Sequence, residues 1–134
     1  MNYFLAKTEP TTYSIDDLER DSQTVWNGVH SPQALRAIKD MRPGDKVFVY
    51  HSGGHTCIVG WMKVISEPRI DEIDPKSWVV DVEFVLKYEE PITLTEIKST
   101  HVFDDWSLVR QGRLSTMAAP KEFVHWLKKK GLRV

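Results

Sequence analysis

Residues 78–89 constrain the fold of this chain more than any other segment. Large apolar side chains alternate along it with mostly polar ones, as Trp78, Val80 and Val82 alternate with Asp81 and Glu83. Successive side chains of an extended chain point to opposite faces, so a period of two is typical of a half-buried antiparallel strand. A strand of this length can curve around a small barrel.

Shorter elements are predicted on both sides of this strand. Strands are expected at residues 3–7, 46–52, 56–65 and 113–117, with a short apolar segment at 24–29 and a loop at 66–76. Helices are expected after the capping residues Ser14 and Ser31, within residues 91–99 and 106–111, and at residues 120–130.

The order of these elements shows no repeated strand–helix–strand unit, which favours the α+β class. We therefore expect a small curved β-barrel of five to six mainly antiparallel strands with short flanking helices. A chain of 134 residues suits one domain, spanning residues 1–134. Barrels of this size bind ligands at a mouth lined by loops.

Several kinds of site are excluded by the residue types. The single cysteine, Cys57, allows neither an internal disulfide nor a cysteine-based zinc site. His51 and His55 flank the turn at Gly53-Gly54, and no further ligand completes a metal set, so no metal is predicted. Because there is no glycine-rich phosphate loop and no nucleophile elbow, we expect no cofactor and no catalytic residues.

Charge and hydropathy limit the classes of partner that the chain can bind. No segment has the pattern of a signal peptide or the length of a membrane span, so we expect a cytoplasmic protein without a membrane partner. The formal net charge of -1 argues against binding to the phosphate backbone by charge alone. A role in nucleic-acid binding would therefore depend on a specific pocket or a local basic patch.

Three segments, at residues 7–13, 25–31 and 49–52, mix aromatic with polar side chains. The rings of Trp26 and Tyr50 suit stacking on a planar ligand that forms hydrogen bonds, and they equally suit a core. Lys7 and Glu9 leave a buried strand together. They form either an ion pair at the rim or two groups that address the polar edge of a ligand.

The chain resembles the EVE domain family in four motifs that occur in the expected order. These are Tyr3-Phe4-Leu5-Ala6-Lys7-Thr8-Glu9-Pro10, Trp26-Asn27-Gly28-Val29, Gly44-Asp45 with Tyr50-His51-Ser52, and Gln111-Gly112-Arg113-Leu114-Ser115. The resemblance runs nearly end to end. It implies a PUA-like fold and recognition of modified bases in nucleic acid, especially modified cytosines, with DNA expected ahead of RNA.

The resemblance also implies a set of site residues. Lys7 and Arg113 would supply positive charge, and Arg110 and Arg113 would contact phosphates. The residues that would line or support an aromatic-lined pocket are Lys7, Glu9, Trp26, Asn27, Gly28, Val29, Ser31, Tyr50, His51, Ser52, Arg113, Leu114 and Ser115.

In this interpretation the pocket holds a base that has left the stack of a duplex. Trp26 and Tyr50 would stack on the base, while Ser52, Glu9 and main-chain groups near Val29 would read its edge. Stacking and edge recognition together must offset an unstacking cost of a few kcal/mol.

Two other functions remain open. ASCH domains, another PUA-like branch, include small amidohydrolases that act on acylated nucleosides through a Lys, a Thr and a Glu. Lys7-Thr8-Glu9 has these residue types, although Thr8 would point to the opposite face of a strand. PUA-like folds also bind RNA, and Arg36, Lys39 and Arg42 could form a basic helix surface, although a solvated face explains them as well.

Overall fold

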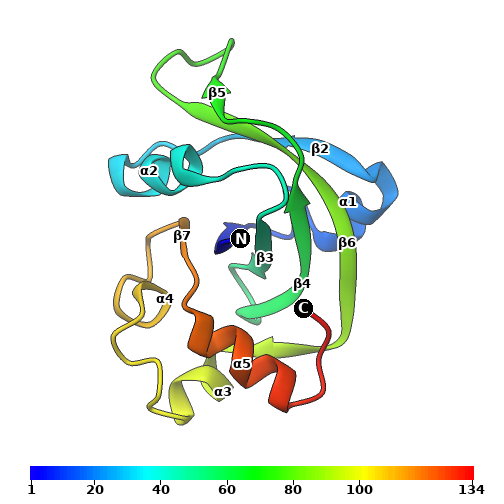
Figure 1. Cartoon of the computed structure of the whole chain (residues 1–134), viewed down its shortest axis with the longest axis vertical. Coiled ribbons are helices and arrows are strands. Elements are labelled where there is room, and N and C mark those ends of the chain that lie inside the picture. The colour runs from blue at the N-terminus through cyan, green and yellow to red at the C-terminus, as the bar shows by residue number, and fades with distance from the viewer.

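The computed structural model describes residues 1–134 and consists of one mixed sheet with five helices around it (Figure 1). The sheet order is β2-β6-β4-β3-β1-β7, and β5 pairs separately with β6. The strands are β1 (Tyr3–Thr8), β2 (Gln23–Trp26), β3 (Lys46–His51), β4 (Cys57–Val64), β5 (Arg69–Ile70), β6 (Trp78–Thr93) and β7 (Thr116–Ala118).

The long alternating strand is confirmed as β6, and it extends further than the sequence predicted. It continues through Pro91 to Thr93, so the helix expected within residues 91–99 covers only α3 (Leu94–Ser99). β6 pairs with β4 on both sides of a register shift between Ile58 and Gly60. Such a bulge bends a strand and tolerates a proline, which explains why Pro91 does not end β6.

The sheet contains one parallel pair, β1 with β3, which the expectation of mainly antiparallel strands allows. Asp45, the residue before β3, accepts a hydrogen bond through its carboxylate from the N–H of Asn2, the residue before β1, at 3.0 Å. The same carboxylate accepts from the Arg42 N–H at 2.9 Å. Asp45 is buried, so this motif residue supports the sheet. The last residues of β1 and β3, Lys7 and Tyr50 among them, consequently lie side by side.

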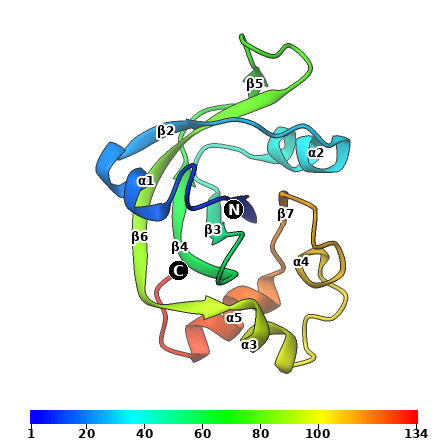
Figure 2. The same cartoon turned by 180° about the vertical axis from the view of Figure 1, so that it is seen from behind.

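The predicted helices are confirmed, with small changes at their ends. Ser14 forms a capping box with Asp17 at α1 (Ile15–Asp21), and Ser31 caps α2 (Pro32–Asp40). The others are α4 (Ser107–Arg110) and α5 (Lys121–Lys129). α2 lies at one end of the molecule, and α3 and α5 lie at the other (Figures 1 and 2). No helix is long and apolar enough to cross a membrane.

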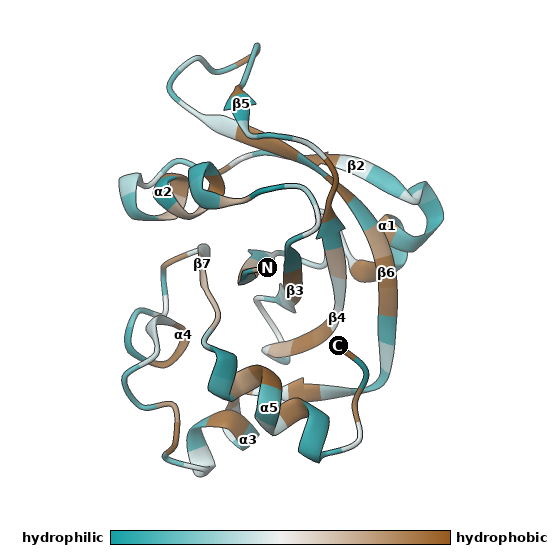
Figure 3. Cartoon of the chain, viewed as in Figure 1, coloured by the Kyte–Doolittle hydropathy of each residue, from teal (hydrophilic) through white to brown (hydrophobic).

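A continuous core fills the inside of the curved sheet. Figure 3 shows hydrophobic stretches along β3, β4 and β6, and alternating hydrophobic and hydrophilic residues in α5. Phe123 of α5 packs edge-to-face on Phe48 of β3, with ring centroids 5.4 Å apart, and also contacts Trp106. This aromatic cluster fixes α5 against one end of the sheet.

The α+β class is confirmed, and the sheet differs in detail from the barrel that we expected. It has seven strands, because the two-residue strand β5 occurs in the predicted loop 66–76. The strand β7 is shorter than the one predicted at residues 113–117. The terminal strands of the sheet order, β2 and β7, do not pair with each other. The sheet is therefore curved but open, and it has two free edges.

A glycine at the bend of β4 tests the importance of this curvature. A Cβ added at Gly60 would lie 2.1 Å from the Leu86 carbonyl oxygen, which is main chain and cannot move aside cheaply. We expect Gly60→Ala to lower the free energy of unfolding by at least about 2 kcal/mol, measured by urea denaturation. Gly112→Ala is the matched control, because nothing lies within 4 Å of the added atom. Equal midpoints for the two variants would contradict this explanation of the bend.

Candidate functional site

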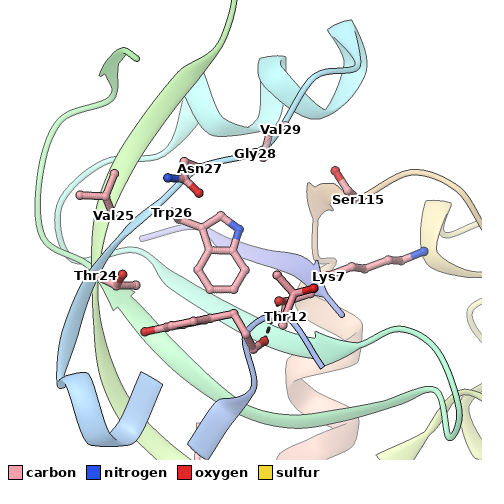
Figure 4. Close-up of a pocket in the computed structure, with 11 residues that line it drawn as sticks. Lys7, Thr12, Thr24, Val25, Trp26, Asn27, Gly28, Val29 and Ser115 are labelled. Carbon is pink, nitrogen blue, oxygen red and sulfur yellow. Dashed lines mark hydrogen bonds between the residues drawn. The ribbon is translucent and has the colours of Figure 1, made fainter. Parts of the chain in front are cut away.

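A cavity of about 390 Å³ lies where the curved sheet fails to close. We call it the seam cavity. One side comes from β2, the terminal strand of the sheet, and the other from the end of β1 and from Ser115, which precedes β7 (Figure 4). The lining residues are Lys7, Thr8, Thr12, Tyr13, Thr24, Val25, Trp26, Asn27, Gly28, Val29 and Ser115.

Trp26 projects into the middle of this site, between the chain segments that line it (Figure 4). Trp26 is only 7% exposed, and its indole N–H forms no hydrogen bond within the chain. Because no fully buried side-chain nitrogen or oxygen lacks a partner, this N–H is accessible to solvent. The other two buried tryptophans differ, since Trp61 donates to the Arg133 carbonyl and Trp106 to the Ala118 carbonyl. Tryptophan N–H groups usually find a partner when buried, so the Trp26 donor is available to a ligand.

Tyr13 forms a second aromatic wall beside Trp26. The two rings meet edge-to-face, with centroids 6.4 Å apart and an interplanar angle of 80°. The Tyr13 hydroxyl donates to Asp21 Oδ2 at 2.8 Å, and the Tyr13 carbonyl accepts from Thr8 Oγ1 at 2.7 Å. Burial and the neighbouring Asp21 raise the pKa of Tyr13, so it remains a neutral phenol.

The segment after β2 brings unpaired main-chain groups to the cavity. None of the N–H groups of Asn27, Gly28 and Val29 donates a hydrogen bond within the chain. Gly28 has a φ of 79°, which a residue with a side chain rarely adopts. The Val29 carbonyl accepts from the buried Ser77 hydroxyl at 2.6 Å, which fixes the far end of the segment.

Lys7 lies at the opposite side of the cavity, and its ammonium group turns away from Trp26 (Figure 4). It donates to the Gly112 carbonyl at 3.0 Å and stands 5.3 Å from the centre of the Tyr50 ring. The Lys7 N–H donates to the Ser115 carbonyl at 2.8 Å. Partial burial lowers the pKa of Lys7 from the ordinary lysine value.

Four predicted residues, Glu9, Tyr50, His51 and Ser52, do not line the seam cavity. Tyr50 is buried beneath Lys7, and the Glu9 carboxylate lies against Gly53 at the turn between β3 and β4. The Ser52 N–H donates to the Thr8 carbonyl at 3.0 Å. These residues therefore support the end of β1, outside the cavity.

His51 supports the first turn of α1. Its Nε2 accepts a hydrogen bond from the Ile15 N–H at 3.0 Å, two residues after Tyr13. Only an unprotonated nitrogen can accept this bond. Burial lowers the pKa of His51, and Asp16 and Lys87 exert opposite, smaller effects on it.

Ser31, Arg113 and Leu114 surround a shallow depression between the start of α2 and the loop 111–115. Ser31 lies two residues after Val29, and Leu114 directly precedes Ser115, so the depression adjoins the seam cavity. The Ser31 hydroxyl caps α2 by accepting from the Ala34 N–H, and Leu114 is buried. Arg113 is exposed and forms no hydrogen bond or ion pair within the chain.

The second predicted phosphate contact, Arg110, is already engaged. Its guanidinium lies 3.4 Å from the Asp105 carboxylate, and both side chains are largely exposed. An exposed ion pair of this kind contributes little to stability and can open, but it offsets the charge of Arg110. Arg113 is therefore the more available cation at the rim.

The six predicted residues that the structure brings together at the cavity are Lys7, Trp26, Asn27, Gly28, Val29 and Ser115. Sequence reasoning singled out the segment that contains Thr12 and Tyr13 but did not select them. The signal that could have identified this wall is an aromatic residue, Tyr13, in the short loop between a buried strand and the helix cap at Ser14. No aspartate or glutamate lines the cavity, and no group of three or more potential metal ligands occurs.

The comparisons with known proteins agree on one family. The model of the EVE domain matches residues 2–130. Rat thymocyte nuclear protein 1 is 33% identical over 128 residues, which cover 75% of this chain and 57% of the rat protein. This chain thus spans little more than half the length of the curated relatives that it matches.

Solved structures show the same fold. A protein from Rhodopseudomonas palustris superimposes with a TM-score of 0.90 at 30% identity, covering 98% of this chain and 93% of the other. Human THYN1, solved in complex with DNA that contains 5-methylcytosine, superimposes with a TM-score of 0.86 at 27% identity over 100% of both chains. The predicted PUA-like α+β fold is confirmed.

The contact between His51 and Ile15 predicts how stability depends on pH. Because the pKa of His51 is lowered in the folded state, the unfolded chain binds a proton more readily. This contribution to stability is fully present above the unfolded pKa of about 6.5, falls as the pH drops toward the folded pKa, and levels off below it.

Urea denaturation between pH 7.5 and 5 measures this effect. His51→Gln retains an acceptor for the Ile15 N–H but cannot be protonated. We therefore expect the free energy of unfolding of this variant to fall less than that of wild type below about pH 6.5. Identical pH profiles for the two proteins would contradict the assigned contact.

Proposed function

This chain belongs to the EVE domain family, and we propose that its seam cavity binds a modified nucleobase, with modified cytosine in DNA as the preferred ligand. The chain would act as one domain over residues 1–134 and would bind without catalysis. Support comes from the human THYN1 relative, which was solved in complex with DNA that contains 5-methylcytosine. The observation that carries the proposal is the indole N–H of Trp26, which has no partner within the chain and is accessible to solvent in an aromatic corner.

The corner formed by Trp26 and Tyr13 suits a planar heterocycle. A base can stack on one ring while its edge contacts the other, and such stacking contributes about 1–3 kcal/mol per base. The volume of about 390 Å³ lies within the usual range for small-ligand sites. In this proposal Tyr13 takes the place that the sequence analysis gave to Tyr50.

Hydrogen-bond donors would read the edge of the base. The Trp26 indole N–H and the N–H groups of Asn27, Gly28 and Val29 are unpaired, and the Ser115 hydroxyl lies across the cavity. Carbonyl oxygens and ring nitrogens of a base accept such bonds. Because these donors have no partner within the chain and a bound ligand would displace water from them, a base with acceptors on its edge is the favoured ligand.

Charge would play a smaller part than the pocket. The net charge is -1, and Arg113 is the available cation beside the cavity. Each phosphate neutralised in a DNA duplex adds about 0.9 to the slope of log affinity against log salt. We therefore expect a shallow salt dependence and a preference for the modified base that persists at physiological salt.

The two alternatives have less support from the contacts. Thr8 donates to the Tyr13 carbonyl and Glu9 lies against Gly53, so the Lys7-Thr8-Glu9 set does not converge on one reacting centre. The RNA-binding alternative needs free basic side chains on α2, but Lys39 Nζ lies 5.0 Å from the centre of the Trp78 ring and is already engaged there. Turnover of acylated cytidine by the purified protein would favour the amidohydrolase and contradict binding without catalysis.

The location of the protein follows from the same proposal. A partner that contains DNA requires an intracellular site, and we retain the cytoplasmic location that the sequence analysis expected. The name of the vertebrate relatives contains the word nuclear, which makes the nucleus the alternative.

A binding titration with paired variants tests the proposed function. Wild type is titrated against DNA with one 5-methylcytosine and against the unmodified duplex, at low and physiological salt. We expect Trp26→Ala to weaken binding to the modified DNA by about one to two orders of magnitude, because it removes the stacking surface.

Trp126→Ala is the matched control, since Trp126 packs on Phe103 and Phe123 in the distant aromatic cluster. It should bind as wild type does after folding has been verified by circular dichroism. A folded Trp26→Ala protein with wild-type affinity would refute the seam cavity as the binding site.

A further inference from the structure

We propose that Lys7 is a positioning residue that fastens the loop 111–115 to the end of β1 and thereby holds Arg113 at the rim of the seam cavity. The tether itself is a property of the fold. Its effect on ligand binding rests on the proposed function.

Lys7 forms hydrogen bonds with the loop at two points. Its main-chain N–H donates to the Ser115 carbonyl at 2.8 Å, and its ammonium donates to the Gly112 carbonyl at 3.0 Å. Arg113 lies between these two attachment points. A single residue of β1 therefore fixes both ends of the segment that carries the exposed guanidinium.

The ammonium group is directed toward the loop rather than into the cavity. Lys7 and Tyr50 occupy the same register position on the parallel strands β1 and β3. The Tyr50 ring lies 5.3 Å from Lys7 Nζ, which allows a cation–π contact. Figure 4 shows the Lys7 side chain running away from Trp26. This direction explains why a buried tyrosine belongs to the site without lining the cavity.

The loop has few other attachments. The Leu114 N–H closes a turn on the Gln111 carbonyl, and the Leu114 side chain is buried. No other side chain forms a hydrogen bond with residues 111–114. Loss of the Lys7 ammonium would leave Gly112 and Arg113 held only by the chain on each side of them, and glycine adds conformational freedom there.

The first test needs no ligand. Lys7→Met keeps an apolar stem of similar length but removes the donor to Gly112. We expect faster cleavage by trypsin after Arg113, followed by mass spectrometry, because a freed loop reaches the protease more readily. Lys46→Met is the matched control, since Lys46 lies 4.7 Å from the centre of the Trp61 ring but touches no part of this loop.

The second test is a double-mutant cycle with DNA that contains 5-methylcytosine. If Lys7 acts through Arg113, then Arg113→Ala weakens binding severalfold in wild type and less than about twofold in the Lys7→Met background. The slope of log affinity against log salt decreases in magnitude by about 0.9 in either single variant and by no more in the double variant. If Lys7 contacts a phosphate directly, the losses add and the slope falls by about twice as much.

The outcomes separate the two proposals. Faster cleavage in Lys7→Met but not in Lys46→Met, with non-additive binding losses, is the expected result. Unchanged cleavage in a folded Lys7→Met protein, or additive losses, would overturn the role of Lys7 even if wild type binds DNA. Faster cleavage in a protein that binds no DNA at all would sustain the tether and refute the proposed function.

Discussion

The open edge between β2 and β7 is the feature on which the site depends. Terminal strands of a sheet expose unpaired N–H and C=O groups, and closed barrels remove them by pairing the two edges. Here the bend of β6 brings the edges near each other without pairing, and the seam cavity fills the gap. Main-chain donors that a closed barrel would use internally, at Asn27, Gly28 and Val29, remain available. The geometry that keeps the two edge strands from pairing therefore also supplies the main-chain donors that could bind the edge of a base.

The residues of the site divide into those that line the cavity and those that hold the lining in place. Trp26 and Tyr13 provide the aromatic surfaces, and Trp26 is almost fully buried. Tyr13 is fixed by Asp21, by Thr8 and by the neighbouring helix start that His51 supports. On the other side, Lys7 fixes the loop that carries Arg113. A site whose walls are fixed before the ligand arrives loses less entropy on binding, which favours selection by shape.

The sequence predicted the parts of this structure that depend on local patterns. The alternation in β6, the caps at Ser14 and Ser31 and the turn at Gly53-Gly54 all act within a few residues, and all are present. The pairing of β1 with β3, the extension of β6 past Pro91 and the open edge depend on contacts between distant residues. For the same reason the sequence named Tyr50 as an aromatic wall: strand register, which no local pattern reveals, buries Tyr50 under Lys7 and leaves Tyr13 beside Trp26.

The most direct test of the account is a titration of the ¹⁵N-labelled protein with DNA that contains one 5-methylcytosine, followed by NMR. The five tryptophans give separate indole N–H signals. We predict that the Trp26 signal and the amide signals of Asn27, Gly28 and Val29 shift on binding, because these donors gain a partner. The indole signals of Trp61 and Trp106, whose donors are already bonded, should remain in place. Shifts confined to α2, with the Trp26 signal unchanged, would contradict recognition of the base in the seam cavity.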